Sequence, residues 1–176
     1  MIDEPAEMAR AERASRRSPG VRARVSDLVA EAQHALEGLG KEGFARLVRG
    51  ASDSQLERRF GNSVAQRALF GGMARQFDPK FAFGFEGDIV YELTRVGNGR
   101  APDRWTIRVG GESAEVVPGG NGQAAVTLRL SVADFARLAA EEVDPQELIF
   151  SDRFGIEGDL GVAAKLQEMF GGPARF

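Results

Sequence analysis

Cysteine is absent from the 176-residue sequence, and histidine occurs once, as His34. Without cysteine the chain cannot form disulfides, thiolate metal sites, iron–sulfur clusters or cysteine nucleophiles. A single histidine excludes a metal site built from several imidazoles. His34 lies among small and polar neighbours on an expected helix, which favours a surface or packed histidine over a lone general base. The sequence therefore predicts no metal or other cofactor.

Basic charge and long apolar runs are also scarce. The 23 lysines and arginines are outnumbered by 26 acidic residues, which gives a formal net charge of −3. Nucleic-acid binding needs a basic surplus on one face, so we expect no nucleic-acid partner. No window approaches the roughly 18 apolar residues of a membrane-spanning helix, and residues 1–10 lack the apolar core of a secretory signal. We expect a cytoplasmic protein without stable membrane insertion.

Apolar residues make up 43% of the chain, which is enough to build a core for one domain with an extra segment. Composition and patterning divide the chain into three regions. Residues 1–20 are rich in Ala, Glu and Arg, and we expect them to form a mobile tail. Residues 21–80 are expected to be helical, and residues 81–176 to form a domain of strands and helices.

Apolar residues recur at three- to four-residue spacing across residues 24–77, which predicts helices. The first is expected over residues 27–39, with glycines at its end. Two more are expected over 53–60 and 64–77. The helical region should end at Asp78-Pro79, because proline cannot continue a helix.

After Pro79 the apolar period changes from about 3.6 to 2, which is typical of strands. A long, half-buried strand is predicted over residues 81–93. Three shorter strands are predicted over 105–109, 114–117 and 126–130, with glycine-rich turns between them. We expect these four strands to form an antiparallel meander in which each strand has one apolar face.

Helical patterning returns at Ser131, which can cap a helix, and again at Asp144-Pro145. A fifth strand is predicted over residues 150–157, followed by a helix capped by Asp159. The fold class is therefore α+β: a five-stranded, mostly antiparallel sheet with helices covering one face. We expect the helices that follow the meander to cover the apolar face of the sheet.

Two clusters in the sequence favour ordinary structural roles. The glycine-rich stretch over residues 155–161 could hold a phosphate, but Asp159 would repel one there. A strand-to-helix turn with an aspartate cap is the favoured interpretation. The carboxylates over residues 141–147 have no basic or histidine partner in register, which favours a solvated surface over acid–base chemistry.

Tyr91 and Trp105 are the only residues of their kinds, and both fall on apolar strand faces. Buried tyrosine and tryptophan usually find a partner for their polar tips, so both residues can belong to the core. They can equally line a ligand cavity that has one polar anchor. The sequence leaves these two interpretations open.

Residues 131–170 resemble the sterol-carrier-protein (type two) lipid-binding domain. The stretch Gly-Asp-Leu-Gly-Val-Ala-Ala-Lys-Leu-Gln over residues 158–167 is similar to the end of that domain, where a strand closes on Ile-x-Gly-Asn/Asp before a helix. Asp144-Pro145-Gln146 with Phe150 resembles its Asn/Asp-Pro turn. The motif Ser-x-x-Asp-Phe-x-x-Leu is matched from Ser131 to Leu138. The family often has Gly-Lys where this chain has Asp152-Arg153.

The resemblance implies a sheet and helices that enclose an apolar tunnel for a fatty acid, a fatty acyl-CoA or a sterol-like lipid, without covalent chemistry. It also implies a bacterial-type family member with a helical extension over residues 21–80. Combined with the strand faces, it suggests ten ligand-binding residues. These are Phe83, Phe85, Tyr91, Trp105, Ile107, Leu128, Phe135, Leu166, Met169 and Phe170.

Two other functions remain open at this stage. An enzyme could use the same cavity for an apolar substrate, with Tyr91, Glu92 and Asp134 as the nearest acid–base candidates. Alternatively, residues 24–77 could form an interaction module that pairs two copies of the chain or binds an enzyme.

Overall fold

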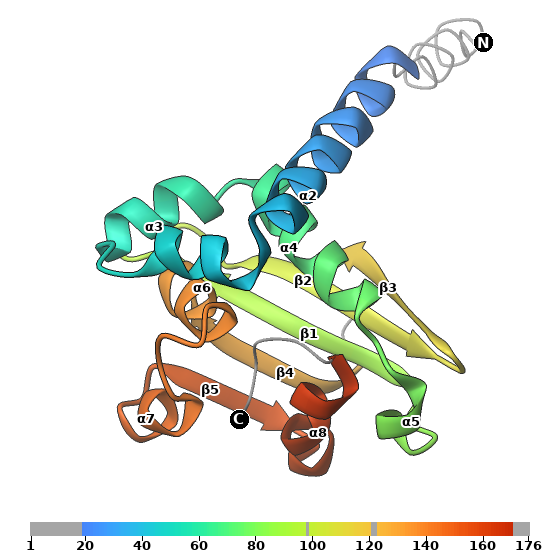
Figure 1. Cartoon of the computed structure of the whole chain (residues 1–176). Coiled ribbons are helices and arrows are strands. Elements are labelled where there is room, and N and C mark those ends of the chain that lie inside the picture. The colour runs from blue at the N-terminus through green and yellow to red at the C-terminus, as the bar shows by residue number, and fades with distance from the viewer. Residues whose placement is uncertain (1–18, 98, 121–122, 171–176) are drawn as a thin grey trace, which may run out of the picture.

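The structure, a computed structural model, describes residues 19–97, 99–120 and 123–170. Within these ranges, helices pack on one face of a five-stranded sheet (Figure 1). The elements in chain order are α2 (Pro19–Val48), α3 (Asp53–Phe60), α4 (Ser63–Arg75), α5 (Pro79–Ala82), β1 (Gly87–Thr94), β2 (Asp103–Gly110), β3 (Ser113–Pro118), β4 (Ala124–Ser131), α6 (Val132–Ala139), α7 (Pro145–Phe150), β5 (Phe154–Gly158) and α8 (Leu160–Phe170). This arrangement confirms the predicted α+β class.

The strand order is β3-β2-β1-β4-β5, so β1 lies at the centre of the sheet. β1 pairs antiparallel with β2 and parallel with β4, and the two outer pairs are antiparallel. The predicted four-strand meander is therefore wrong at its last step, because β4 crosses to the far side of β1. The crossover aligns Ile89 with Val126 and Tyr91 with Leu128. All four side chains are buried, so the parallel pair joins two apolar strand faces in the middle of the sheet.

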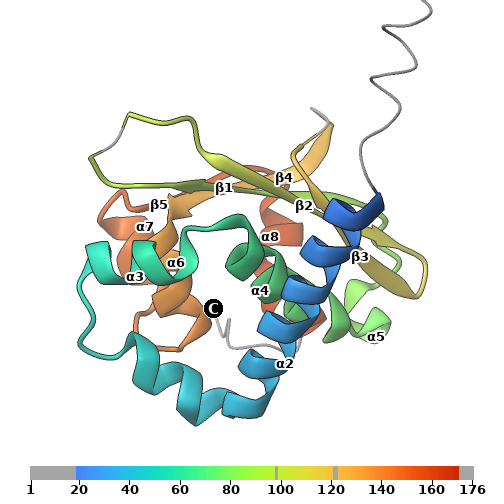
Figure 2. The same cartoon turned by 90° about the horizontal axis from the view of Figure 1, so that it is seen from above.

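Helices from both halves of the chain cover one face of the sheet (Figure 2). The expectation that only the later helices cover this face is wrong, because α4 packs on β2 and β3. Phe70 of α4 is fully buried in the same core cluster as the strands. α6 and α8 pack on β4, and both are short. A five-stranded sheet is wider than these two helices can cover, so α4 is needed over the other strands.

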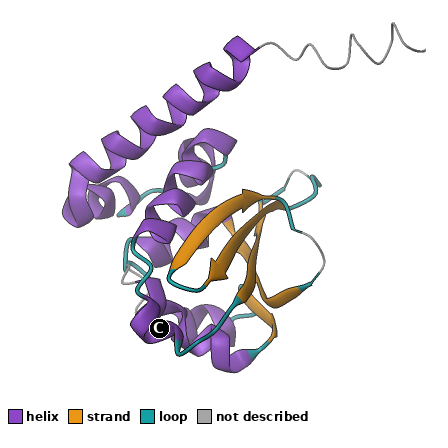
Figure 3. Ribbon diagram, turned by 90° about the vertical axis from the view of Figure 1, so that its right-hand side faces the viewer, coloured by secondary structure: helices purple, strands orange, loops and turns teal. Residues whose placement is uncertain are grey.

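The helix α2 begins at Pro19, earlier than the predicted start at residue 27. It is interrupted at Gly40, whose backbone is non-helical with φ 61° and ψ −178°, close to the predicted end. The beginning of α2 extends away from the sheet (Figures 1 and 3), and the helix packs against α4. The predicted helices that follow are confirmed as α3 and α4. Among the described helices, none is long and apolar enough to cross a membrane.

The first strand is shorter than predicted. Asp78 caps the short helix α5 by accepting a hydrogen bond from the Lys80 backbone N–H (3.0 Å), with Pro79 in the first turn. Phe83 then adopts a left-handed backbone conformation with φ 50°, so β1 begins only at Gly87. The prediction of a strand from residue 81 is wrong, because the Asp-Pro pair starts a helical turn there.

The predicted caps in the C-terminal half are confirmed. The side chains of Ser131, Asp144 and Asp159 each accept a hydrogen bond from a backbone N–H in the first turn that follows. The fifth strand begins at Phe154, not at residue 150. The chain remains helical through Phe150, and the backbone N–H of Arg153 then closes the end of α7 on the Leu148 carbonyl (2.8 Å).

Gly158 joins β5 to α8 at a place where a side chain does not fit. Its φ is +106°, and an added Cβ would lie 2.4 Å from the Ala125 carbonyl oxygen. We expect Gly158→Ala to lower the free energy of unfolding by about 2 kcal/mol or more. Gly72→Ala is the control, because nothing lies within 4 Å of its Cβ position in α4. The control should be neutral or gain up to about 1 kcal/mol. Urea unfolding measures both, and an equally stable Gly158→Ala protein would contradict this account.

Candidate functional site

Four aromatic rings meet beneath the apolar face of the sheet. They come from α4 (Phe70), β1 (Tyr91), β2 (Trp105) and α6 (Phe135). The centroid of the Phe70 ring lies 5.1 Å from that of Tyr91, 5.5 Å from that of Trp105 and 4.9 Å from that of Phe135. Phe70 is therefore the centre of this aromatic cluster, and its side chain has no exposed surface.

The sequence predicted three of these four residues as ligand-wall residues and missed Phe70 in that role. The sequence did indicate that Phe70 is buried, because this residue belongs to the apolar stripe of the helix expected over residues 64–77. Helical spacing does not say which strand or helix that face meets. Only the packing of α4 on the sheet shows that Phe70 stands among the predicted wall residues.

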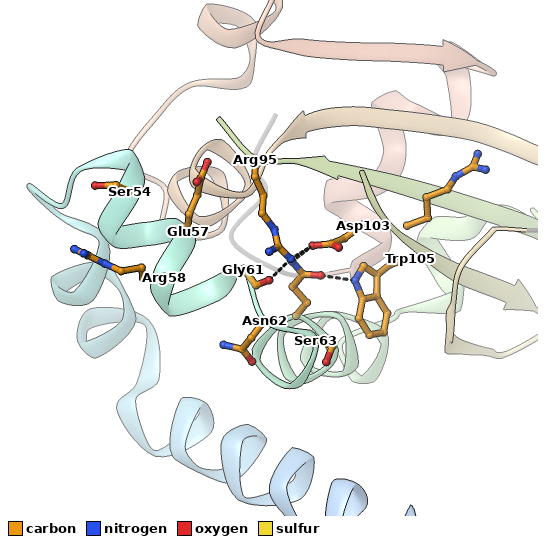
Figure 4. A pocket seen from close by; sticks show the side chains of 11 residues that line it. Ser54, Glu57, Arg58, Gly61, Asn62, Ser63, Arg95, Asp103 and Trp105 are labelled. Carbon is orange, nitrogen blue, oxygen red and sulfur yellow. Dashed lines mark hydrogen bonds and ion pairs between the residues drawn. The ribbon is translucent and has the colours of Figure 1, made fainter. Parts of the chain in front are cut away.

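The polar tip of Trp105 is bonded inside the protein. Its Nε1–H donates a hydrogen bond to Gln66 Oε1 (2.7 Å), and Gln66 is itself buried. Gln66 Nε2 in turn donates to Asp103 Oδ2 (2.9 Å), which also accepts from Arg95 Nη2 (2.5 Å). Arg95 donates to the Gly61 carbonyl as well (Figure 4). This chain of bonds satisfies the indole and holds the N-terminal end of α4 against the sheet.

A polar pocket of about 720 Å³ opens beside this chain of bonds, between α3, the start of α4 and the facing ends of β1 and β2 (Figure 4). Its lining contains three arginines, two carboxylates and the indole of Trp105. The lining residues are Ser54, Glu57, Arg58, Gly61, Asn62, Ser63, Gln66, Arg95, Asp103, Arg104 and Trp105. We call this cavity the polar pocket.

A second cavity, of about 580 Å³, lies on the other side of α4, between α2, α4 and α6. Its apolar lining includes Phe44, Leu69, Met73 and Phe135, together with several glycines and alanines. Charged side chains also line it. They are Glu42, Arg49, Arg75, Glu141 and Glu142. We call this cavity the apolar groove. An apolar floor with charged groups around it suits a ligand with a hydrocarbon part.

The ten predicted ligand residues fall into three groups. Eight are buried in the core, namely Tyr91, Trp105, Ile107, Leu128, Phe135, Leu166, Met169 and Phe170. Phe85 is partly buried and packs against that core. Phe83 is 69% exposed, and Lys165 Nζ lies 4.8 Å from the centre of its ring. Among the ten, Phe135 lines the apolar groove and Trp105 lines the polar pocket.

The three acid–base candidates have structural partners or are buried. Glu92 pairs with Arg104 (2.9 Å) and Arg129 (2.6 Å). Asp134 is buried, and its carboxylate bonds to the guanidinium groups of Arg137 and Arg153. Burial raises the pKa of the Tyr91 hydroxyl well above its ordinary value, so this group is protonated at neutral pH.

Known proteins resemble part of this chain. Residues 84–171, half of the chain, match the SCP-2 sterol transfer family. The chain is 32% identical over 112 residues to peroxisomal multifunctional enzyme type 2 of Mus musculus, covering 61% of this chain and 15% of that protein. It is 28% identical over 83 residues to sterol carrier protein 2 of Homo sapiens, covering 47% of this chain and 15% of that protein. The chain thus spans about 15% of the length of these relatives.

Two solved structures give similar superpositions. Sterol carrier protein 2 from Yarrowia lipolytica (apo form) has a TM-score of 0.49 at 16% identity, covering 64% of this chain and 94% of that one. The inverting sec-alkylsulfatase Pisa1 from Pseudomonas sp. also has a TM-score of 0.49 at 16% identity, covering 88% of this chain and 28% of that one. Because the family match extends over half of its residues, the chain belongs to the SCP-2 sterol transfer family.

Proposed function

We propose that this protein binds and carries an apolar lipid without changing it chemically, with the hydrocarbon part of the lipid in the apolar groove. The observation that carries the proposal is the position of Phe135. This residue belongs to the Ser-x-x-Asp-Phe-x-x-Leu motif of α6 and also lines the groove. Membership of a sterol transfer family supports the same conclusion. Fatty acids, fatty acyl-CoA and sterol-like molecules are the ligand classes we consider.

The size and lining of the groove suit such a ligand. Its volume of about 580 Å³ lies within the range of small-molecule sites. Burying hydrocarbon there is worth about 0.8 kcal/mol per methylene, so a long chain can bind well through its apolar part. Met73 adds a flexible side chain that can adapt to ligands of different shape.

An ion pair at the groove can open when a ligand binds. Arg49, directly after α2, donates two hydrogen bonds to Glu142 Oε1, from Nε (3.1 Å) and from Nη2 (2.9 Å). This ion pair joins the segment after α2 to the segment after α6 at the groove. Because the Arg49 side chain is 64% exposed, water screens the pair and it can open to admit a ligand.

The second candidate is a domain that holds an apolar substrate for an enzyme. It is favoured by the relative named peroxisomal multifunctional enzyme type 2, of which this chain spans 15%. In that case the partner enzyme could bind the helical residues 24–77, which could also pair two copies of this chain. The ligand site would be the same in both candidates, and only the fate of the ligand would differ. We place the protein in the cytoplasm under either candidate.

A charge placed in the groove should weaken binding. Leu69 lines the groove and is only partly buried, so Leu69→Glu leaves the main core intact. We expect the affinity for a fluorescent C18 polyene fatty acid to fall at least about tenfold. The new carboxylate would have to lose its water where it lies beside the hydrocarbon chain of the ligand. Ile149→Glu, on the exposed surface of α7, is the matched control and should bind normally. Wild-type affinity in Leu69→Glu would remove the groove from the proposal.

The bound lipid should be recovered unchanged. Native mass spectrometry of freshly purified protein should show an adduct of one lipid mass, and organic extraction identifies that lipid. After prolonged incubation of the loaded protein, we expect the extracted lipid to have its original mass. A product that forms in wild type but not in Asp134→Asn would instead support an enzyme.

A further inference from the structure

We propose that two copies of this chain pair through the first part of α2, in an antiparallel contact of two helices with twofold symmetry. The partner that fits this surface is therefore a second copy of the same protein. The residues of the contact lie before Gly40, and none of them lines the apolar groove. The pairing thus does not depend on the lipid site.

α2 carries a stripe of apolar residues, much of which is exposed. Leu28, Ala32, Ala35 and Leu39 follow one another at spacings of four, three and four residues. This spacing lines side chains up along one side of a helix, and it is the pattern by which two helices pack in a coiled coil. Leu28 is 53% exposed and Leu39 is 42% exposed, although α2 packs against α4. α4 therefore leaves much of the stripe uncovered.

The beginning of α2 is placed where a second molecule can reach it. It extends away from the sheet, so a helix of another copy can lie along it (Figures 1 and 3). From Pro19 to the interruption at Gly40 the helix is about 30 Å long. Helices in proteins gain most of their stability from packing, and an isolated helix of this length is marginal in water. A second copy would supply packing to this projecting part of α2.

Two charged residues beside the stripe favour a second copy as the partner. Arg24 precedes Leu28 by four residues and Glu31 follows it by three, so all three lie on the same side of the helix. The side chains of Arg24 and Glu31 are exposed. Within the part of the chain that the structure describes, neither of them forms an ion pair. Both charges are therefore available to another molecule.

These two charges also determine the orientation of the pair. When two copies of the helix cross antiparallel near Leu28, Arg24 of each copy lies opposite the partner subunit's Glu31. Twofold symmetry repeats this contact, so one sequence forms two ion pairs between the chains. A parallel pair would place equal residues at the same height, with Arg24 about 10 Å along the axis from the partner subunit's Glu31. The charges therefore favour the antiparallel pair.

The residues on either side of the crossing point suit a close contact. Ala32 and Ala35 continue the stripe from Leu28, and symmetry places them at both ends of the contact. The distance between packed helix axes depends on the side chains at the contact, and alanine allows a short one. Because each α2 leads into its own sheet, the antiparallel pair holds the two folded domains at opposite ends. Each domain then keeps its own apolar groove outside the contact.

A charge at position 28 should separate the two copies. We expect the full wild-type chain to have twice the mass of one chain in sedimentation equilibrium at micromolar concentrations. Leu28→Glu should be monomeric, because two carboxylates would meet at the twofold axis with little access to water. Leu28 is half exposed, so the variant should keep its fold, which circular dichroism checks.

The matched control is Ile149→Glu, at an exposed apolar residue of α7, which should remain dimeric. A monomeric wild type, or a dimeric Leu28→Glu, would overturn the proposal. Leu28→Glu should bind the fluorescent fatty acid with wild-type affinity, and Leu69→Glu should remain dimeric. The pairing and the lipid site can therefore fail independently in these measurements.

Reversing the charges tests the antiparallel orientation. Arg24→Glu and Glu31→Arg each place like charges opposite one another twice, and we expect each to weaken self-association about tenfold. An equimolar mixture of the two variants should form heterodimers about as stable as the wild-type dimer, because both contacts then join opposite charges. Native mass spectrometry distinguishes the heterodimer from the two homodimers by mass.

The control for charge reversal is Arg46→Glu, at an exposed arginine of α2 beyond Gly40, which should associate like wild type. If Arg24→Glu and Glu31→Arg associate as tightly as wild type, the antiparallel orientation is wrong. The orientation is also wrong if both variants are weakened and their mixture forms no heterodimer.

Discussion

The contact of Phe70 with the sheet is the interaction on which the rest of this structure depends. Its ring fills the space between Tyr91, Trp105 and Phe135, and none of its surface is exposed. Burying an aromatic side chain of this size contributes several kilocalories per mole of stability. The family match begins at residue 84, yet the aromatic face of that domain is covered by a helix that precedes it. The matched domain and the helices before it therefore share one core.

Polar groups inside this core set the position of α4. Burying the Trp105 indole and the Gln66 amide without partners would be costly, but each satisfies the other. Because Gln66 also bonds to Asp103, the first turns of α4 are tied to the start of β2. Apolar packing alone would tolerate a shift of the helix along the sheet. The directional hydrogen bonds of Gln66 do not tolerate such a shift. They place Phe70, one turn further along α4, over the aromatic strand residues.

This arrangement puts two different environments on either side of one helix. Towards its start, α4 borders a cavity rich in arginine, and further along it borders a groove lined by apolar side chains. The extra helices thus do more than stabilise the sheet, because they build the walls of both cavities.

The sequence by itself determined those helix starts and strands that depend on neighbouring residues in the chain. Caps at Ser131, Asp144 and Asp159 lie where a short polar side chain precedes an apolar run, and period-2 patterning located β2 and β4. The sequence also showed that Phe135, Tyr91 and Trp105 have an apolar environment. Tertiary structure alone decided that β4 pairs with β1 and that Phe70 meets those rings. These contacts join residues far apart in the chain. Periodicity shows which face of an element is buried, but not which other element covers it.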